Sequence, residues 1–299
     1  MTDSRVETVN LEVQEGEGEK WKSVGQVQLL DDSSEPDAAM NPAMGRRDQL
    51  PRCVKKLLTP TTEHRKLFYL FRHAQGVQPN TNLMILLHGF GDSHIPFDKL
   101  GQTMALPQTA TLTISARSYE KVPFGLGYTY FKEMDYETGD PLPETHPVRR
   151  YSLQAAATKI NIILKQLILE EQWIIPERVF FLGYGAGAAL AVQSCVMWCE
   201  QGHSPLGGAV CVAGGASLLD DDEPIDADKA TTPILLMVGE KDEYFSPANA
   251  ERLQQLYGES VEIYIEPNKG QGMIQNQSEM QRVMEFLSRR LVRLSMLPS

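Results

Sequence analysis

The chain has 299 residues, of which 42% are hydrophobic, and 28 basic against 39 acidic side chains give a formal charge of −11. This length suits one large α/β domain or two small ones, and the acidic balance argues against nucleic-acid binding and polybasic membrane contact. The longest apolar stretches, such as 160–169, fall well short of the roughly 18 residues that a membrane-spanning helix needs. The N-terminus lacks a signal-peptide pattern, so we expect a cytoplasmic protein.

Residues 1–56 differ in composition from the rest and are predicted to form an acidic, partly disordered extension. Acids outnumber bases by 11 to 5 between Met1 and Asp48, and 31–37 is rich in Asp, Ser, Glu and Pro. Alternating hydrophobic residues predict two short strands, around Val9 and Val27, on either side of a Gly-Glu-Gly turn at 16–18. Solvated chain is the expected state of this extension, and docking of a protein partner is the alternative.

From about residue 57 onward, apolar strand patterns alternate with amphipathic helix patterns. The pattern predicts a single domain over 57–299, built as a doubly wound, mainly parallel sheet with helices on both faces. The expected strands are 67–71, 83–87, 110–116, 179–183, 209–213, 233–239 and 261–265. One helix is expected to begin near Pro96. The other expected helices cover 151–170, 186–199, 246–257 and 278–294.

Two features suggest metals at first sight. Cys195 and Cys199 are spaced i,i+4 on a predicted helix, but no second Cys/His pair lies at zinc spacing, which favours buried structural thiols. The acidic loop 220–228 lacks the glycine and terminal glutamate of a calcium loop, which favours a solvated surface loop. We therefore expect neither a metal nor a cofactor.

A connection of about 30 residues after the strand at 110–116 is rich in aromatic residues, glycine and proline. So long a connection between elements is more often a binding wall or lid than a linker, although simple packing is the alternative. The candidate ligand-binding residues in it are Phe124, Leu126, Tyr128, Tyr130 and Phe131.

Four special turns follow predicted strands, where the carboxyl ends of parallel strands form ligand sites. They are 88–92, 183–187, 239–242 and 269–273. The turn Gly183-Tyr-Gly-Ala-Gly187, which we call the elbow, has the spacing of Gly-x-Ser-x-Gly, in which a strand turns sharply and exposes its middle side chain. The middle residue is Gly185. A phosphate-binding Gly-x-Gly-x-x-Gly pattern fails because residue 188 is alanine.

Taken together, these turns resemble the phospholipase/carboxylesterase family of α/β-hydrolases that contains the acyl-protein thioesterases. The resemblance covers about 83–291 and rests on Leu87-His-Gly-Phe-Gly-Asp92, where the family has Leu-His-Gly-Leu-Gly-Asp. It also rests on Phe124-Gly-Leu-Gly-Tyr-Thr-Tyr-Phe131, the elbow and Gly239-Glu-Lys-Asp242. Each motif alone is weak, but the set in this order is specific, and it implies the α/β-hydrolase fold.

The resemblance also implies roles for individual residues. Asp242 matches the acid that orients the catalytic histidine, and the main-chain N–H groups of Phe90 and Ala186 match the oxyanion hole. The serine position is Gly185. One family pattern places the histidine at Gln271 and another at Gln275, so a glutamine replaces it in either case.

Glycine has no atom with which to attack a carbonyl, and a glutamine amide is not basic near neutral pH. We therefore expect a catalytically inactive family member that binds an acyl or other apolar small molecule, or a protein partner. A weak or repurposed ester or thioester hydrolase is one alternative. A scaffold that docks a partner through the N-terminal extension is the other.

Overall fold

The computed structural model describes residues 6–13, 22–30, 69–74, 80–123, 127–215 and 231–293. The chain divides into two compact units, Met1–Pro42 and Ala43–Ser299, and each is described by itself.

In the first unit, β1 (Val6–Val13) and β2 (Lys22–Leu30) pair in antiparallel fashion. The register runs from Val6 opposite Leu30 and shifts by a β-bulge between Leu11 and Glu12. This confirms the two predicted strands, which are longer than the alternating positions alone indicated. The predicted turn at 16–18 and the acidic run at 31–37 lie outside the described residues.

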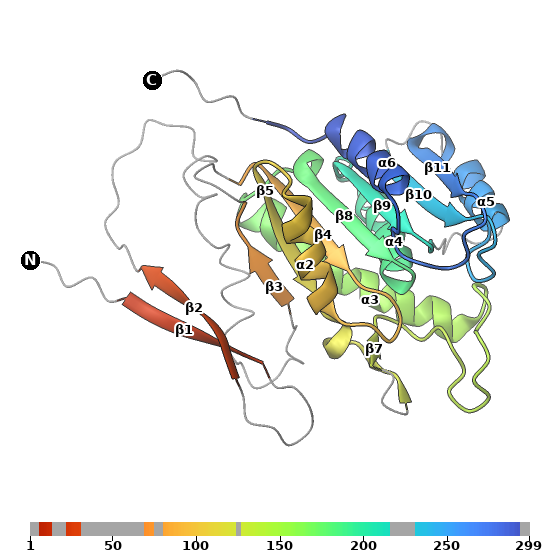
Figure 1. Cartoon of the computed structure of the whole chain (residues 1–299), viewed down its shortest axis with the longest axis horizontal. Coiled ribbons are helices and arrows are strands. Elements are labelled where there is room, and N and C mark those ends of the chain that lie inside the picture. The colour runs from red at the N-terminus through yellow and green to blue at the C-terminus, as the bar shows by residue number, and fades with distance from the viewer. Residues whose placement is uncertain are drawn as a thin grey trace, which may run out of the picture. The chain divides into compact units, whose positions relative to one another are not determined.

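The second unit is organised around one seven-stranded sheet in the order β11-β10-β9-β8-β4-β5-β3 (Figure 1). Neighbouring strands are parallel, except that the edge strand β3 runs antiparallel to β5. The strands are β3 (Tyr69–Arg72), β4 (Asn82–Leu87), β5 (Thr109–Ile114), β8 (Val179–Tyr184), β9 (Gly208–Val212), β10 (Ile234–Gly239) and β11 (Val261–Glu266). A separate short pair is formed by β6 (Glu120–Lys121) and β7 (Tyr128–Thr129).

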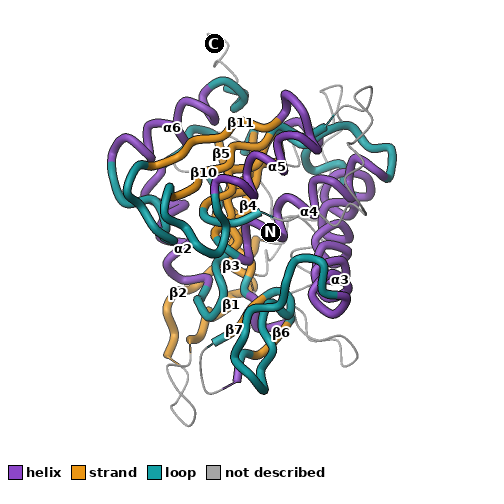
Figure 2. Tube along the Cα trace, turned by 90° about the vertical axis from the view of Figure 1, so that its right-hand side faces the viewer, coloured by secondary structure: helices purple, strands orange, loops and turns teal. Residues whose placement is uncertain are grey.

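Helices cover both faces of this sheet, as the alternating pattern predicted (Figure 2). One face packs against α2 (His94–Met104) and α6 (Gln277–Ser288). The other face packs against α3 (Pro147–Lys165), α4 (Ala186–Glu200) and α5 (Pro247–Tyr257). Shorter helical turns are η1 (Ala116–Ser118), η3 (Gln166–Glu170), η4 (Pro176–Arg178) and η5 (Gly258–Ser260). None of the helices in these described segments has the length and apolar composition of a membrane span.

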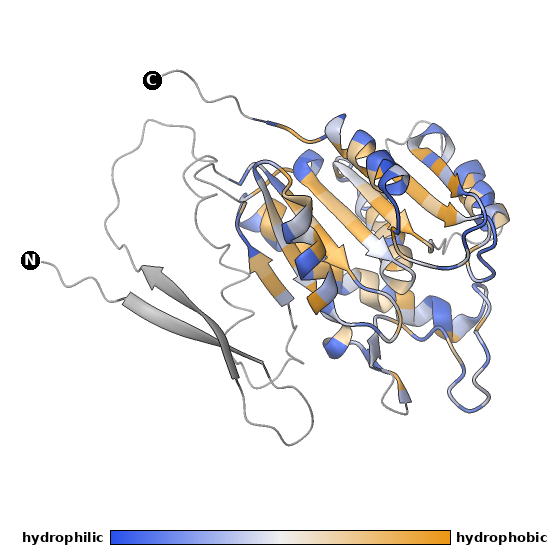
Figure 3. Cartoon of the chain, in the orientation of Figure 1, coloured by the Kyte–Doolittle hydropathy of each residue, from blue (hydrophilic) through white to orange (hydrophobic). Residues whose placement is uncertain are grey.

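The core follows from the composition of the central strands. Every residue of β4, β5, β9 and β10 is buried, because helices exclude water from both faces of these strands. Figure 3 shows the same strands as the most hydrophobic part of this unit. Small residues at the start of α4 let this helix sink into the core, where it is buried from Ala186 to Trp198.

Two helices differ from their predicted bounds for local reasons. The helix predicted at 151–170 begins one turn earlier, because the His146 ring accepts the Val148 N–H and Pro147 occupies the first helical position. It becomes π-helical after Lys165. The helix predicted to reach 294 ends at Ser288, and the following segment lies against β4, where the Asn82 amide bonds both main-chain groups of Val292.

Candidate functional site

The elbow forms at the carboxyl end of β8, where the chain turns directly into α4. Gly185 has φ +51° and ψ −114°, and this positive φ favours glycine over residues with a side chain. Its N–H donates to the Val212 carbonyl at 3.0 Å, and its carbonyl accepts from the Ala189 N–H at 3.0 Å. The turn is therefore held between β9 and the first turn of α4.

The glycines of the elbow are required for different reasons. A Cβ on Gly183 would overlap the Gly187 carbonyl, and one on Gly187 would overlap the Leu87 carbonyl. Both positions are thus closed to any side chain by backbone atoms. A Cβ on Gly185, in contrast, would meet only the Gly89 Cα, at 3.9 Å. The middle position of the elbow has room for a side chain, and only its backbone conformation favours glycine.

Asp242 lies in the turn after β10, close to the elbow. It is 3% exposed, and one carboxylate oxygen, Oδ1, accepts the N–H groups of Tyr244 at 2.9 Å and Phe245 at 3.0 Å. The other oxygen, Oδ2, is buried and has no hydrogen-bond partner among the described residues. An unpaired buried carboxylate oxygen is costly, and a donor such as an imidazole N–H would satisfy it.

The loop after β11 supplies the glutamine. Lys241 N–H donates to the Lys269 carbonyl at 2.7 Å, which joins this loop to the turn that carries Asp242. Gln271 lines the same cavity as Gly185. Gln275 is not part of that lining, and its N–H donates to the Glu279 carboxylate at 2.8 Å. Of the two alternatives left open by the sequence, only Gln271 belongs to the described lining of this cavity.

The two predicted oxyanion donors also meet at this cavity. Phe90 lies in the turn after β4, Ala186 begins α4, and both residues line the cavity with Gly185. Within the described part of the chain, neither main-chain N–H has an acceptor. Free N–H groups at a helix start and a neighbouring turn are suited to hold a carbonyl or anionic oxygen.

His88 braces the turn that carries Phe90. Its Nδ1 is 2.8 Å from the Gly89 carbonyl, and its Nε2 accepts the Ala116 N–H at 3.0 Å. This pattern assigns the ring proton to Nδ1 and leaves no lone pair for a substrate. Burial lowers the pKa of His88, which keeps the ring neutral.

Of the predicted ligand-binding residues, Tyr128, Tyr130 and Phe131 are not part of the described lining. Phe124 and Leu126 lie outside the described residues. Tyr130 and Phe131 are buried, and the Tyr130 hydroxyl accepts the His88 N–H and donates to the Ile114 carbonyl at 2.7 Å. The half-buried Tyr128 accepts the Gly91 N–H through its carbonyl. Tyr128 and Tyr130 therefore support the turn at 88–92 through these hydrogen bonds.

The cavity itself has a volume of about 860 Å³, within the range of small-molecule sites. Its floor is made of glycines and alanines, which leave the space open. The described lining consists of Phe90, Glu133, Met134, Pro141, Leu142, Pro143, Glu144, Arg149, Tyr184, Gly185, Ala186, Ala189, Ala213, Gly214, Gly215, Glu243, Tyr244, Phe245, Asn249 and Gln271.

One wall comes from the later part of the long connection after 110–116, in which the sequence analysis expected a binding wall but named only earlier residues as candidates. Residues 133–144 form a tight excursion in which Met134 pairs with Pro141 and the Leu142 N–H donates to the Glu133 carbonyl at 2.8 Å. The turn at its tip is visible in the sequence as Asp135-Tyr-Glu-Thr-Gly139-Asp140, but turn chemistry does not say which side chains face a cavity.

Burial perturbs the acids of this wall. It raises the pKa of Glu133 to about 7, against the opposing effects of the Arg149 charge and the Thr129 hydroxyl. It also raises the pKa of Glu144, which Arg149 and Arg252 partly offset. The Arg149 guanidinium donates to the Leu142 carbonyl at 2.6 Å, so its charge is fixed at the cavity wall.

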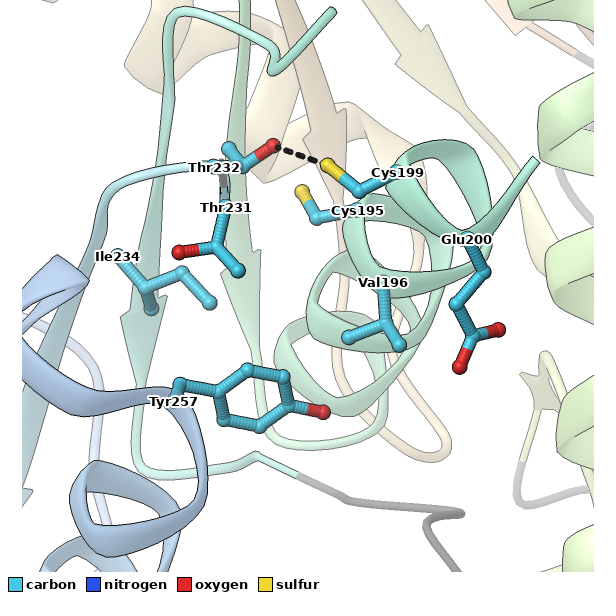
Figure 4. Close-up of a pocket in the computed structure, with 8 residues that line it drawn as sticks. All are labelled: Cys195, Val196, Cys199, Glu200, Thr231, Thr232, Ile234 and Tyr257. Atoms are coloured by element: carbon cyan, nitrogen blue, oxygen red, sulfur yellow. Dashed lines mark hydrogen bonds between the residues drawn. The ribbon is translucent and has the colours of Figure 1, made fainter. Parts of the chain in front are cut away.

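A second cavity, of about 20 Å³, lies where α4 meets the start of β10 and Tyr257 (Figure 4). This volume holds about one water molecule. The Cys199 thiol is 3.6 Å from the Thr232 hydroxyl, and Cys195 is buried beside it with a pKa raised by burial. A buried thiol kept protonated is a poor metal ligand, which is consistent with a structural role for Cys195.

The order of these elements and turns agrees with a family model described as phospholipase/carboxylesterase, which matches residues 72–291. The chain belongs to the phospholipase/carboxylesterase family. Its mostly parallel sheet with helices on both faces is the α/β-hydrolase fold of that family.

Two curated relatives are described as uncharacterized hydrolases. The protein from Mycosarcoma maydis is 32% identical over 139 residues, which cover 45% of this chain and 49% of that protein. The protein from Schizosaccharomyces pombe is 28% identical over 119 residues, which cover 38% of this chain and 46% of that protein. The chain thus matches about half the length of these two relatives.

Solved structures share the fold of this family member at low sequence identity. Zea mays acyl-protein thioesterase 2 has a TM-score of 0.58 and 20% identity, covering 75% of this chain and 99% of that one. Esterase PE8 has a TM-score of 0.56 and 22% identity, with 75% and 99% coverage. The Bacillus cereus carboxylesterase has a TM-score of 0.56 and 16% identity, with 75% and 95% coverage.

Proposed function

We propose that this chain is a catalytically inactive member of the phospholipase/carboxylesterase family that binds a small molecule in the cavity above Gly185. The observation that carries the proposal is the composition of the lining. Among the described lining residues there is no serine, threonine, cysteine, lysine or histidine. Acyl transfer by this fold needs a nucleophile and a base at that place.

The residues at the triad positions support inactivity together. Gly185 supplies no attacking oxygen, and the Gln271 amide cannot accept a proton near neutral pH. Asp242 retains a buried oxygen without a partner, as expected of an acid whose histidine has been lost. The members of a triad act as a unit, so the loss of one member already removes most of the catalysis. Asp242 alone cannot replace the missing serine and histidine.

Retention of the cavity supports ligand binding. A site released from selection for chemistry would tend to fill with larger side chains, whereas the floor here remains glycine and alanine. The N–H groups of Phe90 and Ala186 also remain without acceptors in the described segments. These features suit a ligand that carries a hydrogen-bond acceptor.

The same N–H groups favour one second candidate, a weak ester or thioester hydrolase. An oxyanion hole and a binding pocket without a working triad can retain roughly 10³-fold catalysis over water. Such activity would use water rather than a covalent serine intermediate.

Two measurements distinguish these candidates. Purified full-length protein is incubated with p-nitrophenyl butyrate and with an acyl thioester, and separately with a fluorophosphonate probe. We expect no serine labelling and no saturable turnover. Saturable turnover that is lost in Phe245→Trp, which narrows the cavity, would establish the weak hydrolase. Labelling of a single serine would overturn the proposed inactivity.

A further inference from the structure

The helix α3 carries a second set of apolar side chains on the side that faces solvent. Its buried side packs into the core, as an amphipathic helix requires. On the opposite side, Val148, Tyr151 and Ile162 are 45%, 79% and 51% exposed. Single exposed apolar residues are ordinary, whereas several on one face of one helix indicate a contact surface.

The exposed positions of α3 recur at intervals of three and four residues. They form a row, which we call the outer row, of Val148, Tyr151, Ala155, Thr158 and Ile162, followed by the half-buried Lys165. This is the heptad spacing with which one helix packs along another, because it keeps the row on one side of the helix over several turns. The exposure of the outer row shows that no described element of the same chain covers it.

A groove of about 340 Å³ lies beside the outer row, between α3 and the neighbouring α4 (Figure 2). On α3 it is lined by Thr158, Asn161, Ile162 and Lys165, which are spaced i, i+3, i+4 and i+7. Four residues at this spacing form the hole that receives one side chain of a facing helix. Met197 lines the groove from α4.

The groove also contains a polar residue that needs a donor. Asn161 is 2% exposed, and its Nδ2 donates to the Ala157 carbonyl at 3.1 Å and to the Ser194 carbonyl at 3.2 Å. Its Oδ1 has no hydrogen-bond partner among the described residues. A buried acceptor without a donor is costly, so an occupant that brings a hydroxyl or an N–H is favoured.

The chain itself displays a side chain of this kind. Tyr151 lies on the outer row and combines an exposed ring with a hydroxyl donor. When two copies of α3 are aligned antiparallel about a two-fold axis between Ala155 and Thr158, Tyr151 of one copy lies opposite Ile162 of the other. The symmetry then places both rings at equivalent grooves, as a self-complementary interface requires.

Charges near the ends of α3 favour the antiparallel direction. Arg150 lies near its start, and Glu170 and Glu171 follow its end. Antiparallel packing brings the basic start of one helix and the acidic end of the other to the same end of the pair. Parallel packing would bring like charges together, which is unfavourable.

We propose that two copies of this chain associate through α3, antiparallel and two-fold symmetric, with Tyr151 of each copy in the α3–α4 groove of the other. The Tyr151 hydroxyl donates to Asn161 Oδ1, and its ring contacts Ile162 and Met197. This association goes beyond the proposed function and does not depend on what the cavity above Gly185 binds.

Sedimentation velocity of the full-length chain, over about a hundredfold range of concentration, measures the association. One pair of helices makes a small interface, so we expect a reversible dimer with a Kd on the order of 10 μM. A chain that sediments as a monomer throughout would overturn the inference and leave this face to a contact with a different protein.

Variants then locate the interface. Ile162→Glu should raise the Kd about tenfold or more, because it buries an unpaired charge in each groove. Tyr151→Phe, which keeps the ring and removes the donor, should raise it about threefold or more. Met284→Glu, at an apolar residue of α6 that is 37% exposed, is the matched control and should leave the Kd unchanged.

Thermal melting shows that each variant is folded, and Ile162→Ser gives a second substitution at the same position. A Kd that Ile162→Glu and Ile162→Ser leave unchanged, or that Met284→Glu raises equally, would overturn the assignment to this face. An unchanged Kd in Tyr151→Phe would overturn the contact between the hydroxyl and Asn161.

Disulfide formation tests the direction of packing. In the proposed alignment, Val148 of one copy lies opposite Lys165 of the other. A mixture of Val148→Cys and Lys165→Cys copies should therefore form a cross-linked dimer under mild oxidation. Neither variant alone should exceed the background of the natural chain, which has its own cysteines. Cross-linking of Val148→Cys with itself would indicate parallel packing and overturn the antiparallel arrangement.

Discussion

Single residues decide whether the proposed loss of catalysis is reversible. Gly185 has room for a Cβ, Asp242 keeps a free oxygen, and Gln271 lies on the same cavity. If the proposed triad positions are right, the supporting framework is in place and only the serine and histidine side chains are missing from it.

We expect the double substitution Gly185→Ser with Gln271→His to create an esterase. The serine would supply the attacking oxygen, the histidine would take its proton, and Asp242 Oδ2 would accept the histidine N–H. Turnover of p-nitrophenyl butyrate should exceed that of the natural chain by about 10²-fold or more. Fluorophosphonate labelling of residue 185 should accompany the gain.

The matched control is Gly185→Ala with Gln271→His, which has the same backbone strain and the same histidine but no nucleophile. Equal turnover in both double variants would show that the new activity does not come from a triad. It would also argue against Gln271 as the histidine position.

At the scale of elements, the elbow contains glycines that are required for two different reasons. Backbone atoms leave no space for a Cβ at Gly187, whereas at Gly185 only the positive φ favours glycine. We predict that Gly187→Ala destabilises the protein more than Gly185→Ala does. The first places a methyl group against the Leu87 carbonyl and forces β4 and α4 apart. The second costs about 1–3 kcal/mol through its positive φ alone.

Urea unfolding of both variants measures the difference. We expect Gly187→Ala to lower the free energy of unfolding by more than about 3 kcal/mol or to prevent folding, as overpacking against backbone does. A Gly187→Ala variant no less stable than Gly185→Ala would mean that α4 moves freely away from the sheet.

The loop that carries Gln271 depends on an ion pair between elements. Lys269 and Glu279 form a buried salt bridge, with 9% and 1% of their side chains exposed, and Lys269 also donates to the Met273 carbonyl at 2.8 Å. Lys269→Met should lower the free energy of unfolding by about 3–5 kcal/mol, because it leaves Glu279 buried without its partner.

The double variant Lys269→Met with Glu279→Met tests the reason for that loss. Replacing both charges by apolar side chains should recover most of the stability, since no charge then remains buried alone. If the double variant is as unstable as the single one, the loop depends on the lysine stem or its bond to Met273 rather than on charge compensation.

At the scale of the whole molecule, the sequence predicted the architecture, and it named only some of the residues in the described cavity lining. Apolar runs such as that of β4 identify buried strands because helices cover both faces, and this property is local in sequence. The resemblance to the family, carried by the turns after β4, β8, β10 and β11, then predicted roles for Phe90, Gly185, Asp242 and either Gln271 or Gln275.

The lining could not be predicted because it depends on where long connections pack. The aromatic residues Tyr130 and Phe131 were predicted to line the site. Both are buried, and the Tyr130 hydroxyl accepts the N–H of His88 in the turn at 88–92. The wall instead comes from Glu133 and its neighbours, a few residues further on. Nothing in composition distinguishes a ring that braces a turn from one that faces a ligand.

That wall also makes the stability of the molecule depend on pH. Burial raises the pKa of Glu133 from 4.5 to about 7, so between these values the folded protein keeps a proton that the unfolded chain releases. Stability from this group is therefore full below about pH 4.5 and is lost as pH rises to about 7. With allowance for solvent screening of a half-buried group, the loss should be about 1–3 kcal/mol.

The effect is isolated by comparing the natural chain with Glu133→Gln, because other groups act in the opposite direction. Burial lowers the pKa of His94 to about 4, so this histidine adds stability as pH rises above that value. It does so equally in both proteins. We expect the stability difference in favour of Glu133→Gln, from urea unfolding, to grow between pH 4.5 and 7 and then to level off. A difference that does not change over this range would mean that Glu133 ionises alike in the folded and unfolded chains, and that the cavity wall is well hydrated.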